Sequence, residues 1–482
     1  MNIKSLVFIL FLCIQAHAQR IGWLPFKGEN FEKSNQSIVG TDAQGIYIYS
    51  QEQTKAMLTK HTHQNGNIVY STPIEFVDRL NQVQDITIFA DSTSIFYSTF
   101  NPFKTKTTLW RMRAPNATNA QTTLPRRLSE VSNTTSEDDE INHNIRITKD
   151  LKTVVAIEVF SPNARKKSIN ILFFDQNLQR TNEYTYQASY NGWQISVQDF
   201  LLDEAGNAFF VVAYKNEMQR RNSLNQTYYE VLKCYKNGQK MVKSQNISVP
   251  LPHDDLHLKI SQATNQVSLI GFYFELKNEV FDGIMYQHFT ADSLQNIGAS
   301  YVGFTENLRS KFAQTFAERN SRLSDLSILK ILNRSDSGLV VIAEVNYKVA
   351  QNMSFGVNPA MGRELFYKHF GEIVVFCTAA NGSVAWEQLI PKTQVCREDS
   401  PFGSFALLQK TDKLSFFFNE DLDLKSPLYQ VDITNIGELK PKGVVAENFI
   451  GFFGSGKQIT DKSLWIQGIK KREKGVLKIT EY

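Results

Sequence analysis

The chain has 482 residues, and 52 lysines and arginines stand against 48 aspartates and glutamates, so the formal net charge at pH 7 is +4. This balance excludes the concentrated basic composition of most nucleic-acid-binding proteins, so no nucleic-acid partner is expected. Hydrophobic residues make up 42% of the chain and charged residues 21%, which excludes a largely disordered protein. The aromatic content of 12% favours strands.

Residues 1–18 have the pattern of a secretory signal peptide. Lys4 provides the positive charge, residues 6–14 form a short apolar run, and Ala16-His17-Ala18 is a small-x-small cleavage site. We therefore expect an exported chain that begins at Gln19 and works in the periplasm or outside the cell. No later stretch has the length and apolar character of a transmembrane helix.

Short apolar or alternating runs recur along the chain and are separated by turn residues, whereas helical periodicity is rare. Eight of these runs are nearly continuous in apolar character, as is typical of the second strand in a repeated unit. They span residues 45–49, 94–100, 153–160, 207–214, 266–274, 338–345, 413–418 and 463–468. Several follow tight turns in which an aspartate precedes a glycine, such as Asp203 to Gly206 and Asp336 to Gly338.

A third and a fourth strand follow most of these runs. Three of the connecting hairpins carry Asn-Gly, at residues 65–66, 237–238 and 381–382, and this pair suits a type I′ turn. Units of four antiparallel strands bury both faces when they stack around an axis. We therefore predict an all-β fold, a β-propeller of eight blades, with seven as the alternative. Residues 21–26 would supply the strand that the last unit lacks, so the two termini would close one blade.

The propeller is predicted as a single domain over residues 19–482, with two interruptions. Residues 305–323 read as a helix capped by Thr305, with Leu308, Phe312 and Phe316 recurring on one face. Residues 347–370 read as a long loop inserted between the second and third strands of the sixth unit.

Three cysteines remain after removal of the signal peptide, so at most one disulfide can form within the chain. Cys377 and Cys396 flank one hairpin and are the disulfide candidate. The alternative is that all three are separate buried thiols, and the sequence does not decide between the two.

Four segments of the sixth unit carry a family resemblance. Residues 323–330, 338–345, 371–376 and 385–394 resemble uncharacterised secreted β-propeller-like proteins of Bacteroidota. The resemblance implies a Gram-negative envelope setting, and it brings no catalytic residues with it.

Charged clusters fall in the loops that join the second strand to the third and the fourth strand to the next unit. In a propeller these loops gather on one face, which we expect to bind a protein or a glycan. The candidate residues are Asp138, Asp139, His143, Arg165, Lys166, Lys167, His253, Asp254, Asp255, His257 and Arg397.

Some of these residues are also metal candidates. His253, Asp255 and His257 could offer nitrogen and oxygen ligands to a divalent ion, although a solvated loop explains the same spacing. Asp138 and Asp139 could bind Ca²⁺ through their oxygens, although an exposed acidic loop again explains them. We expect no other cofactor.

The signal-like segment and the repeats favour a secreted propeller that binds or scaffolds a protein or glycan partner, and the family resemblance implies that it works in the envelope. The alternative is a propeller glycosidase or polysaccharide lyase in which carboxylates face each other across the central funnel.

Overall fold

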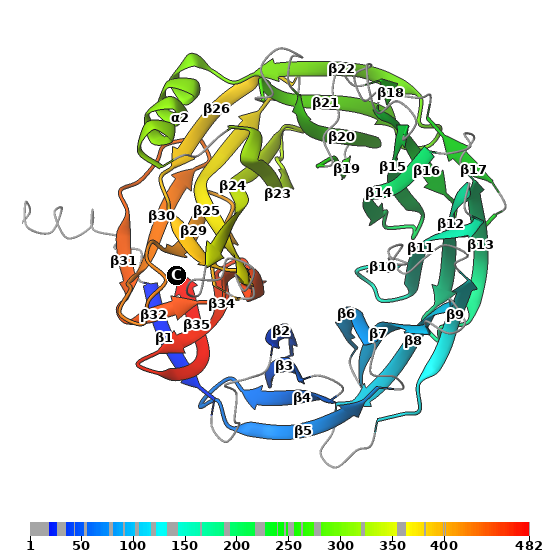
Figure 1. The fold of residues 1–482 in the computed structure, drawn as a ribbon, viewed down its shortest axis with the longest axis horizontal. Helices are drawn as coiled ribbons and strands as arrows, with labels where there is room; N and C mark the ends of the chain where they lie inside the picture. The colour runs from blue at the N-terminus through cyan, green and yellow to red at the C-terminus, as the bar shows by residue number, and fades with distance from the viewer. Residues whose placement is uncertain are drawn as a thin grey trace, which may run out of the picture.

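The computed structural model describes most of the chain. The described residues are 19–26, 35–42, 44–52, 55–76, 81–89, 92–101, 106–116, 122–132, 143–163, 166–187, 193–216, 227–238, 240–244, 247–248, 255–261, 264–273, 281–319, 323–353, 363–379, 382–398, 400 and 402–481. They form eight antiparallel sheets of four or five strands, arranged as the blades of a ring around one axis (Figure 1).

The first half of the ring contains blades 1 to 4, each numbered from its innermost strand outward. Blade 1 consists of β2 (Asn35–Thr41), β3 (Gly45–Glu52), β4 (Lys55–Thr62) and β5 (Ile68–Glu75). Blade 2 consists of β6 (Asn81–Ile88), β7 (Ser92–Asn101), β8 (Lys106–Pro115) and β9 (Arg126–Ser132). Blade 3 consists of β10 (His143–Ile147), β11 (Thr153–Asn163), β12 (Lys166–Asp175) and β13 (Arg180–Gln187). Blade 4 consists of β14 (Trp193–Leu202), β15 (Ala208–Asn216), β16 (Thr227–Cys234), β17 (Met241–Lys243) and the short β18 (Ile247–Ser248).

The second half contains blades 5 to 8. Blade 5 consists of β19 (His257–Ser261), β20 (Gln266–Tyr273), β21 (Gly283–Thr290) and β22 (Asn296–Gly303). Blade 6 consists of β23 (Leu326–Asn333), β24 (Leu339–Met353), β25 (Arg363–Thr378), β26 (Val384–Ile390) and the short β27 (Gln394–Arg397). Blade 7 consists of β28 (Ala406–Gln409), β29 (Lys413–Asn419), β30 (Leu428–Thr434) and β31 (Gly443–Ala446). Blade 8 consists of β32 (Phe449–Gly451), β33 (Lys457–Thr460), β34 (Ser463–Lys470), β35 (Glu473–Glu481) and β1 (Gln19–Pro25).

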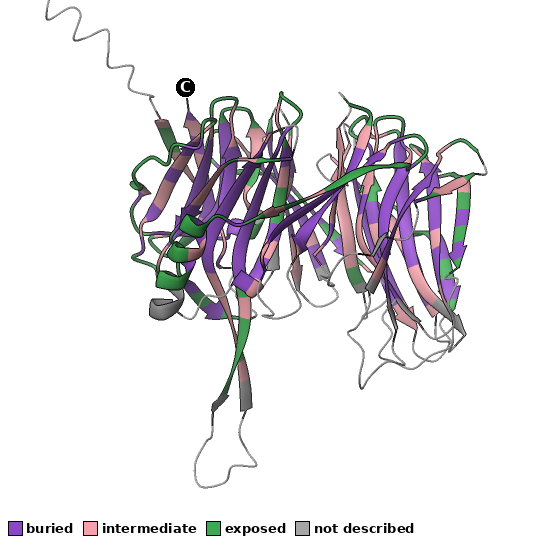
Figure 2. Ribbon diagram, turned by 90° about the horizontal axis from the view of Figure 1, so that it is seen from above, coloured by how far each residue is buried: buried purple, intermediate pink, exposed green. Residues whose placement is uncertain are grey.

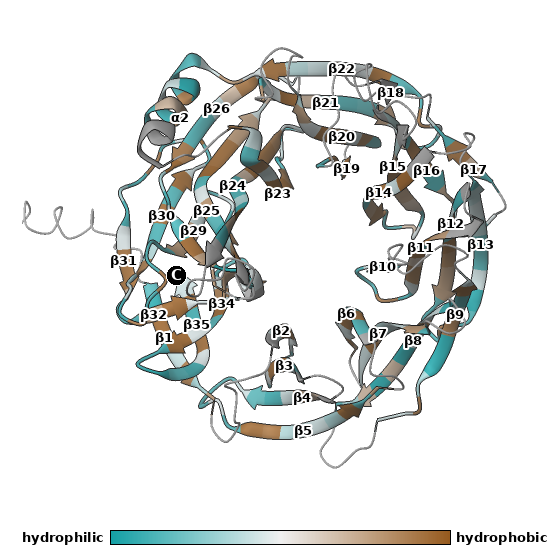
Figure 3. Ribbon diagram, viewed as in Figure 1, coloured by the Kyte–Doolittle hydropathy of each residue, from teal (hydrophilic) through white to brown (hydrophobic). Residues whose placement is uncertain are grey.

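The predicted propeller is confirmed, and its blade number is eight. Each of the eight apolar runs forms or lies largely within the second strand of its blade, from β3 in blade 1 to β34 in blade 8. A second strand has a partner on both sides and an adjacent blade against each face. Its residues are therefore buried in succession, as the first eight residues of β7 are. The outer strand β13 alternates instead, and Figure 3 shows it as mostly hydrophilic.

The two ends of the chain close the ring in blade 8. Strand β1 lies at the outer edge of this blade and pairs with β35 over seven residues, from Gln19 opposite Glu481 to Pro25 opposite Gly475. The ring of Trp23 packs edge-on against Phe449 of the innermost strand, at 5.9 Å between centroids. The N-terminal segment thus supplies the fourth strand, as the sequence predicted.

The core of the molecule is divided among the contacts between blades. In the described part of the chain, the buried apolar residues form eight clusters, and each cluster joins two neighbouring blades. Blade 6 also docks on blade 7 through Trp386, whose ring nitrogen donates to the carbonyl of Asn435 at 3.3 Å. Gly437 lies so close that an added Cβ would come within 2.5 Å of this ring. Each blade is thus held mainly by its two neighbours.

Helix α2 (Glu306–Arg319) forms where the sequence predicted a helix, and the short helix η2 (Leu323–Asp325) follows it. The hydroxyl of Thr305 accepts the amide of Leu308 at 3.3 Å and caps the first turn. Leu308 and Phe312 are buried in the core between blades 5 and 6, whereas the side chain of Phe316 lies outside the description. None of the helices in the described ranges has the length and apolar character required to cross a bilayer.

Residues 347–370 differ from the predicted long loop. Strands β24 and β25 continue through most of this segment and remain paired from Asn346 opposite Phe370 to Met353 opposite Arg363. They form a two-stranded arm that extends well beyond the other strands (Figure 2). The residues alternate between two faces, and Tyr347 stacks on His369 across the pair at 4.7 Å. Cross-strand contacts of this kind stabilise a two-stranded ribbon. The residue pattern of either strand alone does not predict that pairing.

The predicted disulfide between Cys377 and Cys396 is absent, and Cys234, Cys377 and Cys396 are all buried free thiols. Cys396 pairs with Lys368 of β25, and Cys377 lies nine positions farther along the same strand. At about 3.3 Å per residue this separation is roughly 30 Å, whereas a disulfide needs Cα atoms within about 7 Å. The connection between β26 and β27 carries Cys396 outward toward the arm.

Candidate functional site

Consecutive strands of a blade run in opposite directions, so the connections alternate between the two ends of the ring. We call the end with the first-to-second and third-to-fourth connections the turn face. The end with the second-to-third and fourth-to-first connections is the loop face. The sequence predicted a binding site on the loop face.

Five of the predicted site residues lie outside the described residues: Asp138, Asp139, Arg165, His253 and Asp254. The backbone of Lys166 opens strand β12, but its side chain is likewise outside the description. Lys167 follows it in β12 and is half-buried, and the exposed Arg397 ends β27 opposite Tyr367 of the arm.

His143 is in the described part, but it does not face solvent. Its Nε2 lies 3.4 Å from Oε1 of Glu158, and both side chains are buried. The hydroxyl of Ser129 in blade 2 also donates to Glu158. His143 thus belongs to the contact between blades 2 and 3 and is not available for ligand binding on a surface.

Asp255 and His257 are the two predicted residues that the structure brings into direct contact. Oδ1 of Asp255 lies 2.8 Å from Nε2 of His257, and Oδ2 accepts the amide of Ile328 in blade 6 at 2.6 Å. Asp199 of blade 4 approaches the other ring nitrogen at 3.8 Å and accepts the amide of Leu258 at 2.8 Å. The group therefore ties together the innermost strands of blades 4, 5 and 6.

The charges around His257 determine its protonation. Burial alone would lower the pKa of His257, but the hydrogen bond and the charge of Asp255, together with the charge of Asp199, raise it above its usual value. Both oxygens of Asp255 are already engaged within the protein. In the ranges that the structure describes, no cluster of three metal-ligating side chains occurs.

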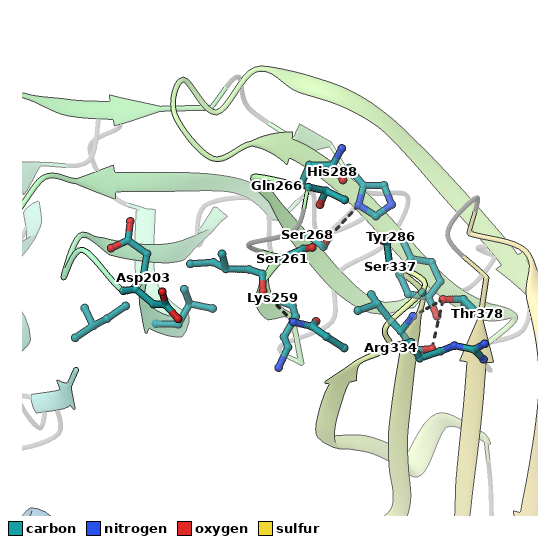
Figure 4. A pocket seen from close by; sticks show the side chains of 18 of the residues that line it. Asp203, Lys259, Ser261, Gln266, Ser268, Tyr286, His288, Arg334, Ser337 and Thr378 are labelled. Carbon is teal, nitrogen blue, oxygen red and sulfur yellow. Dashed lines mark hydrogen bonds between the residues drawn. The ribbon is translucent and has the colours of Figure 1, made fainter. Parts of the chain in front are cut away.

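The turn face carries a cavity of about 1180 Å³ that the sequence did not predict. Its inner part is lined by the innermost strands and first turns of blades 3 to 6, including Arg146, Lys149, Glu204 and Lys259. Its outer part runs outward over the contact between blades 5 and 6 (Figure 4). We call this cavity the groove.

Three aspartates in the groove are engaged in holding their own turns. Thr148 donates to Asp150 at 2.6 Å, and the amide of Asn207 donates to Asp203 at 2.8 Å. Asp336 forms a double contact with Arg334, at 2.9 and 2.7 Å. Hydrogen bonds from Thr148 and from Arg334 hold the pKa values of Asp150 and Asp336 below their usual range. They are therefore poor proton donors for acid catalysis at neutral pH.

The outer part of the groove contains one histidine. Nδ1 of His288 lies 2.9 Å from the hydroxyl of Ser268, within blade 5 (Figure 4). Burial lowers the pKa of His288, so its imidazole is neutral at neutral pH. Burial also raises the pKa of the neighbouring Tyr286, whose phenol therefore keeps its proton.

The inner part of the groove is lined by two lysines, Lys149 after β10 and Lys259 of β19. Lys330 of β23 is exposed on the innermost strand of blade 6. Burial, followed by the charges of Lys149 and Lys330, lowers the pKa of Lys259, and the charge of Asp199 opposes this effect.

A signal for the groove exists in the sequence, but it was missed. The innermost strands of blades 3, 5 and 6 each carry a basic residue near the first turn. The site prediction from the sequence used the longer charged loops instead. Aligning the innermost strands of the eight repeats would have placed these basic residues at one end of the ring.

No family model matches the chain, and no curated protein sequence matches it. Solved structures with a similar architecture include the polysaccharide lyase Uly1, at 10% identity over 97% of this chain and 94% of that one, with a TM-score of 0.40. The β-propeller domain of the Trilobed protease from Pyrococcus furiosus has 10% identity over 87% of this chain and 98% of that one, with a TM-score of 0.37. A prolyl endopeptidase structure has 8% identity over 92% of this chain and 55% of its own chain, with a TM-score of 0.41. At these scores the likeness says nothing about activity.

Proposed function

We propose that this protein is an exported envelope protein that binds a polysaccharide in the groove of the turn face. The observation that carries the proposal is the groove itself, which is formed by four blades and lined by both polar and apolar side chains. Its hydroxyl, amide and charged groups can exchange hydrogen bonds with a ligand, and its apolar side chains can pack against one. Such a lining suits the many hydroxyl groups of a sugar chain.

The export part of the proposal rests on the signal-like segment at residues 1–18. The Gram-negative envelope setting rests on the family resemblance of the sixth unit alone.

A blocking substitution tests the proposed site. Thr264→Trp places a large side chain on an exposed turn that lines the groove, and Thr185→Trp places the same side chain on the exposed outer strand β13. Affinity electrophoresis against a panel of envelope and plant polysaccharides should show retardation of the wild type and of T185W. T264W should migrate as if no polysaccharide were present. Equal retardation of T264W would show that the groove is not the site.

Crosslinking in the native cells tests the choice of partner. If the ligand is a polysaccharide, the crosslinked material should carry sugar and no reproducible protein. A single envelope protein recovered in repeated experiments would overturn the glycan proposal in favour of a scaffolding role.

A polysaccharide lyase is the second candidate, and His288 is the observation that favours it. A neutral, half-buried imidazole in a polar groove suits proton abstraction next to a carbonyl group. Polygalacturonate incubated with the wild type would then gain the ultraviolet absorbance of a new carbon–carbon double bond, and His288→Gln would abolish this gain. Binding without any such gain would support a binding protein alone.

A further inference from the structure

The outer edge of blade 5 is formed by strand β22, which lies on the outer rim of the ring (Figure 1). This strand of eight residues pairs with β21 on one side, and among the described residues no strand pairs with its other side. The open side presents a row of backbone amides and carbonyls. Only another extended chain can satisfy such a row in a regular ladder.

Strand β22 lacks the features that usually protect an open edge. Natural sheets prevent unwanted pairing with charged side chains, with proline, with very short edge strands or with a covering element. The sequence of β22 is NIGASYVG, which contains neither a charge nor a proline, and most of its residues are exposed. Ile297 and Tyr301 are 51% and 46% exposed.

The outermost strands of the other blades do have such protection. Strands β1, β5, β9, β13 and β26 each contain at least one charged residue. Strands β17, β18, β27 and β31 are only two to four residues long. In the part of the chain that the structure describes, β22 is therefore the one long outer edge without protection.

We propose that β22 pairs with β22 of a second copy of this chain, antiparallel and edge to edge, so that the two blades form one continuous sheet. A two-fold axis places each open amide of one copy against a carbonyl of the other, because both edges carry the same pattern in opposite directions. Neither strand is charged, so no like charges face each other across the axis. With a single edge of this kind per described chain, the assembly closes as a dimer.

The side chains of β22 suit this pairing. Ala299 and Tyr301 lie two residues apart and therefore on one face of the sheet, where Tyr301 packs edge-on against Tyr273 at 5.3 Å. Antiparallel pairing would bring these two residues of one copy next to those of the other, and aromatic side chains strengthen such cross-strand contacts. Ile297 lines the outer groove, so the second copy would lie beside its outer end. The inference itself does not depend on what the groove binds.

The test uses variants of the full chain that carry opposite charges at the same two positions. G298K/A299K and G298E/A299E each place like charges on the open edges of both copies. A Cβ added at Gly298 would meet no atom within 4 Å, so the fold accommodates this change. T185K/Q187K places two lysines at exposed positions of the outer strand β13 and is the matched control. Sedimentation velocity over a range of protein concentrations measures dimerisation, and circular dichroism verifies that each variant is folded.

The wild type and T185K/Q187K should dimerise with the same dissociation constant. Each β22 variant alone should dimerise at least about tenfold more weakly, because like charges meet across the axis. An equimolar mixture of the lysine and glutamate variants should recover the dimer, since opposite charges then face each other. This recovery is expected only if both copies use the same edge.

Three results would overturn the inference. A wild type that stays monomeric at every concentration would show that β22 does not bind a second copy, and the edge would then suit an extended segment of another protein. A dimer that the β22 substitutions leave unchanged would place the interface elsewhere on the ring. Weaker dimerisation without recovery in the mixture would show that the substitutions do not act by separating two β22 edges.

Discussion

Asp199 and Asp255 act in equivalent ways in two successive blades. Each accepts a backbone amide from the innermost strand of the next blade, at Leu258 and Ile328 respectively. Among the described residues no strand pairs with a strand of a neighbouring blade, so these carboxylates supply hydrogen bonds from one blade to the next. His257 lies between the two carboxylates, and its charge state therefore affects how strongly three blades are held together.

Protonation of His257 should make the stability of the ring depend on pH. Because its pKa is raised in the folded state, the stabilisation is fully present below the unfolded value of about 6.5 and is lost as pH rises through the folded pKa. His257→Gln should therefore lower the free energy of unfolding more at about pH 5.5 than at about pH 8.5. Urea unfolding at both values measures this difference.

Asp255→Asn provides the control for this prediction. In the D255N background the main partner of the imidazolium is lost and only Asp199 remains, so the effect of His257→Gln should vary much less with pH. A pH-independent cost of His257→Gln in the wild-type background would contradict the proposed coupling.

A buried ion pair in blade 6 should matter more than an exposed one nearby. Nζ of Lys392 lies 2.7 Å from Oε1 of Glu344, and both side chains are buried. Lys392→Met should destabilise the protein by about 3–5 kcal/mol, because it leaves the carboxylate of Glu344 buried and uncompensated. E344Q/K392M should recover part of this loss. Chemical denaturation of the wild type, K392M and E344Q/K392M measures their free energies of unfolding.

Lys348 serves as the matched control in the same blade, since it pairs with Glu398 in an exposed position. Lys348→Met should cost less than about 1 kcal/mol because solvent screens this pair. If Lys392→Met lowers the free energy of unfolding no more than Lys348→Met does, the buried pair is not more important than the exposed one, and the prediction is wrong.

At the scale of elements, the arm formed by β24 and β25 is the largest departure from a compact blade. The short strand β27 pairs with β25 from Tyr367 to Phe370 and extends the sheet only at the base of the arm. The farther residues Gln351 to Met353 pair only with Arg363 to Leu365 among the described residues. The outer arm therefore adds little to the packing of the ring.

Shortening the arm should leave the propeller intact. Ala350 and Phe366 are directly paired, so an Asn-Gly turn can replace residues 351–365. We expect the melting temperature to stay within roughly 2 °C of the wild type, because the described residues that are removed pair only with each other. Differential scanning calorimetry measures this change.

A longer deletion provides the comparison. Asn346 and Phe370 are also paired, so the same turn can replace residues 347–369. This deletion removes the stacked Tyr347 and His369 and most of the pairing with β27, and it should lower the melting temperature clearly. Equal destabilisation by both deletions would show that the outer arm contributes to the ring after all.

At the scale of the whole molecule, stability depends on closing the ring. The eight apolar clusters form a continuous circle, and the cluster between blades 8 and 1 includes Leu24 of β1. Strand β1 thus links the first residues of the described fold to the last ones. Loss of this strand would leave blade 8 with an unpaired edge and weaken two contacts between blades at once.

Two substitutions in β1 test this closure. Leu24 is buried at 7% exposure, whereas Ile21 on the same strand is 38% exposed. Leu24→Ala should cost about 2–4 kcal/mol in unfolding free energy because it opens a cavity in the closing cluster. Ile21→Ala should cost less than about 1 kcal/mol. Guanidinium unfolding compares the two, and similar costs would show that β1 does not close the ring.

The sequence predicted those features that depend on local patterns. The second strands were found because a strand buried on both faces has long apolar runs, as Val154 to Ile157 of β11 show. The closing strand was found because residues 21–26 had the right pattern and blade 8 lacked a partner. The arm was not predicted because residues 347–370 are largely exposed, and their sequence resembles that of a loop when the pairing of the two strands is unknown.

The candidate site was predicted poorly for a different reason. Arg146, Lys259 and Arg334 lie far apart in the chain, and no local pattern marks them as neighbours. The sequence also could not separate a buried His143 from an exposed one, since its partner Glu158 lies across a strand pair. The same holds for the cysteines, whose separation depends on where β27 joins the arm.

By itself, the sequence determined the propeller, the strand order within each blade and the closure of the ring. These follow from turn residues and from the burial of central strands, and both act over a few residues. Only the tertiary structure decided between eight blades and seven and showed that the turn face carries the groove. The physical reason is the circular arrangement, which brings the innermost strands of blades 3 to 6 side by side although more than a hundred residues of chain connect them.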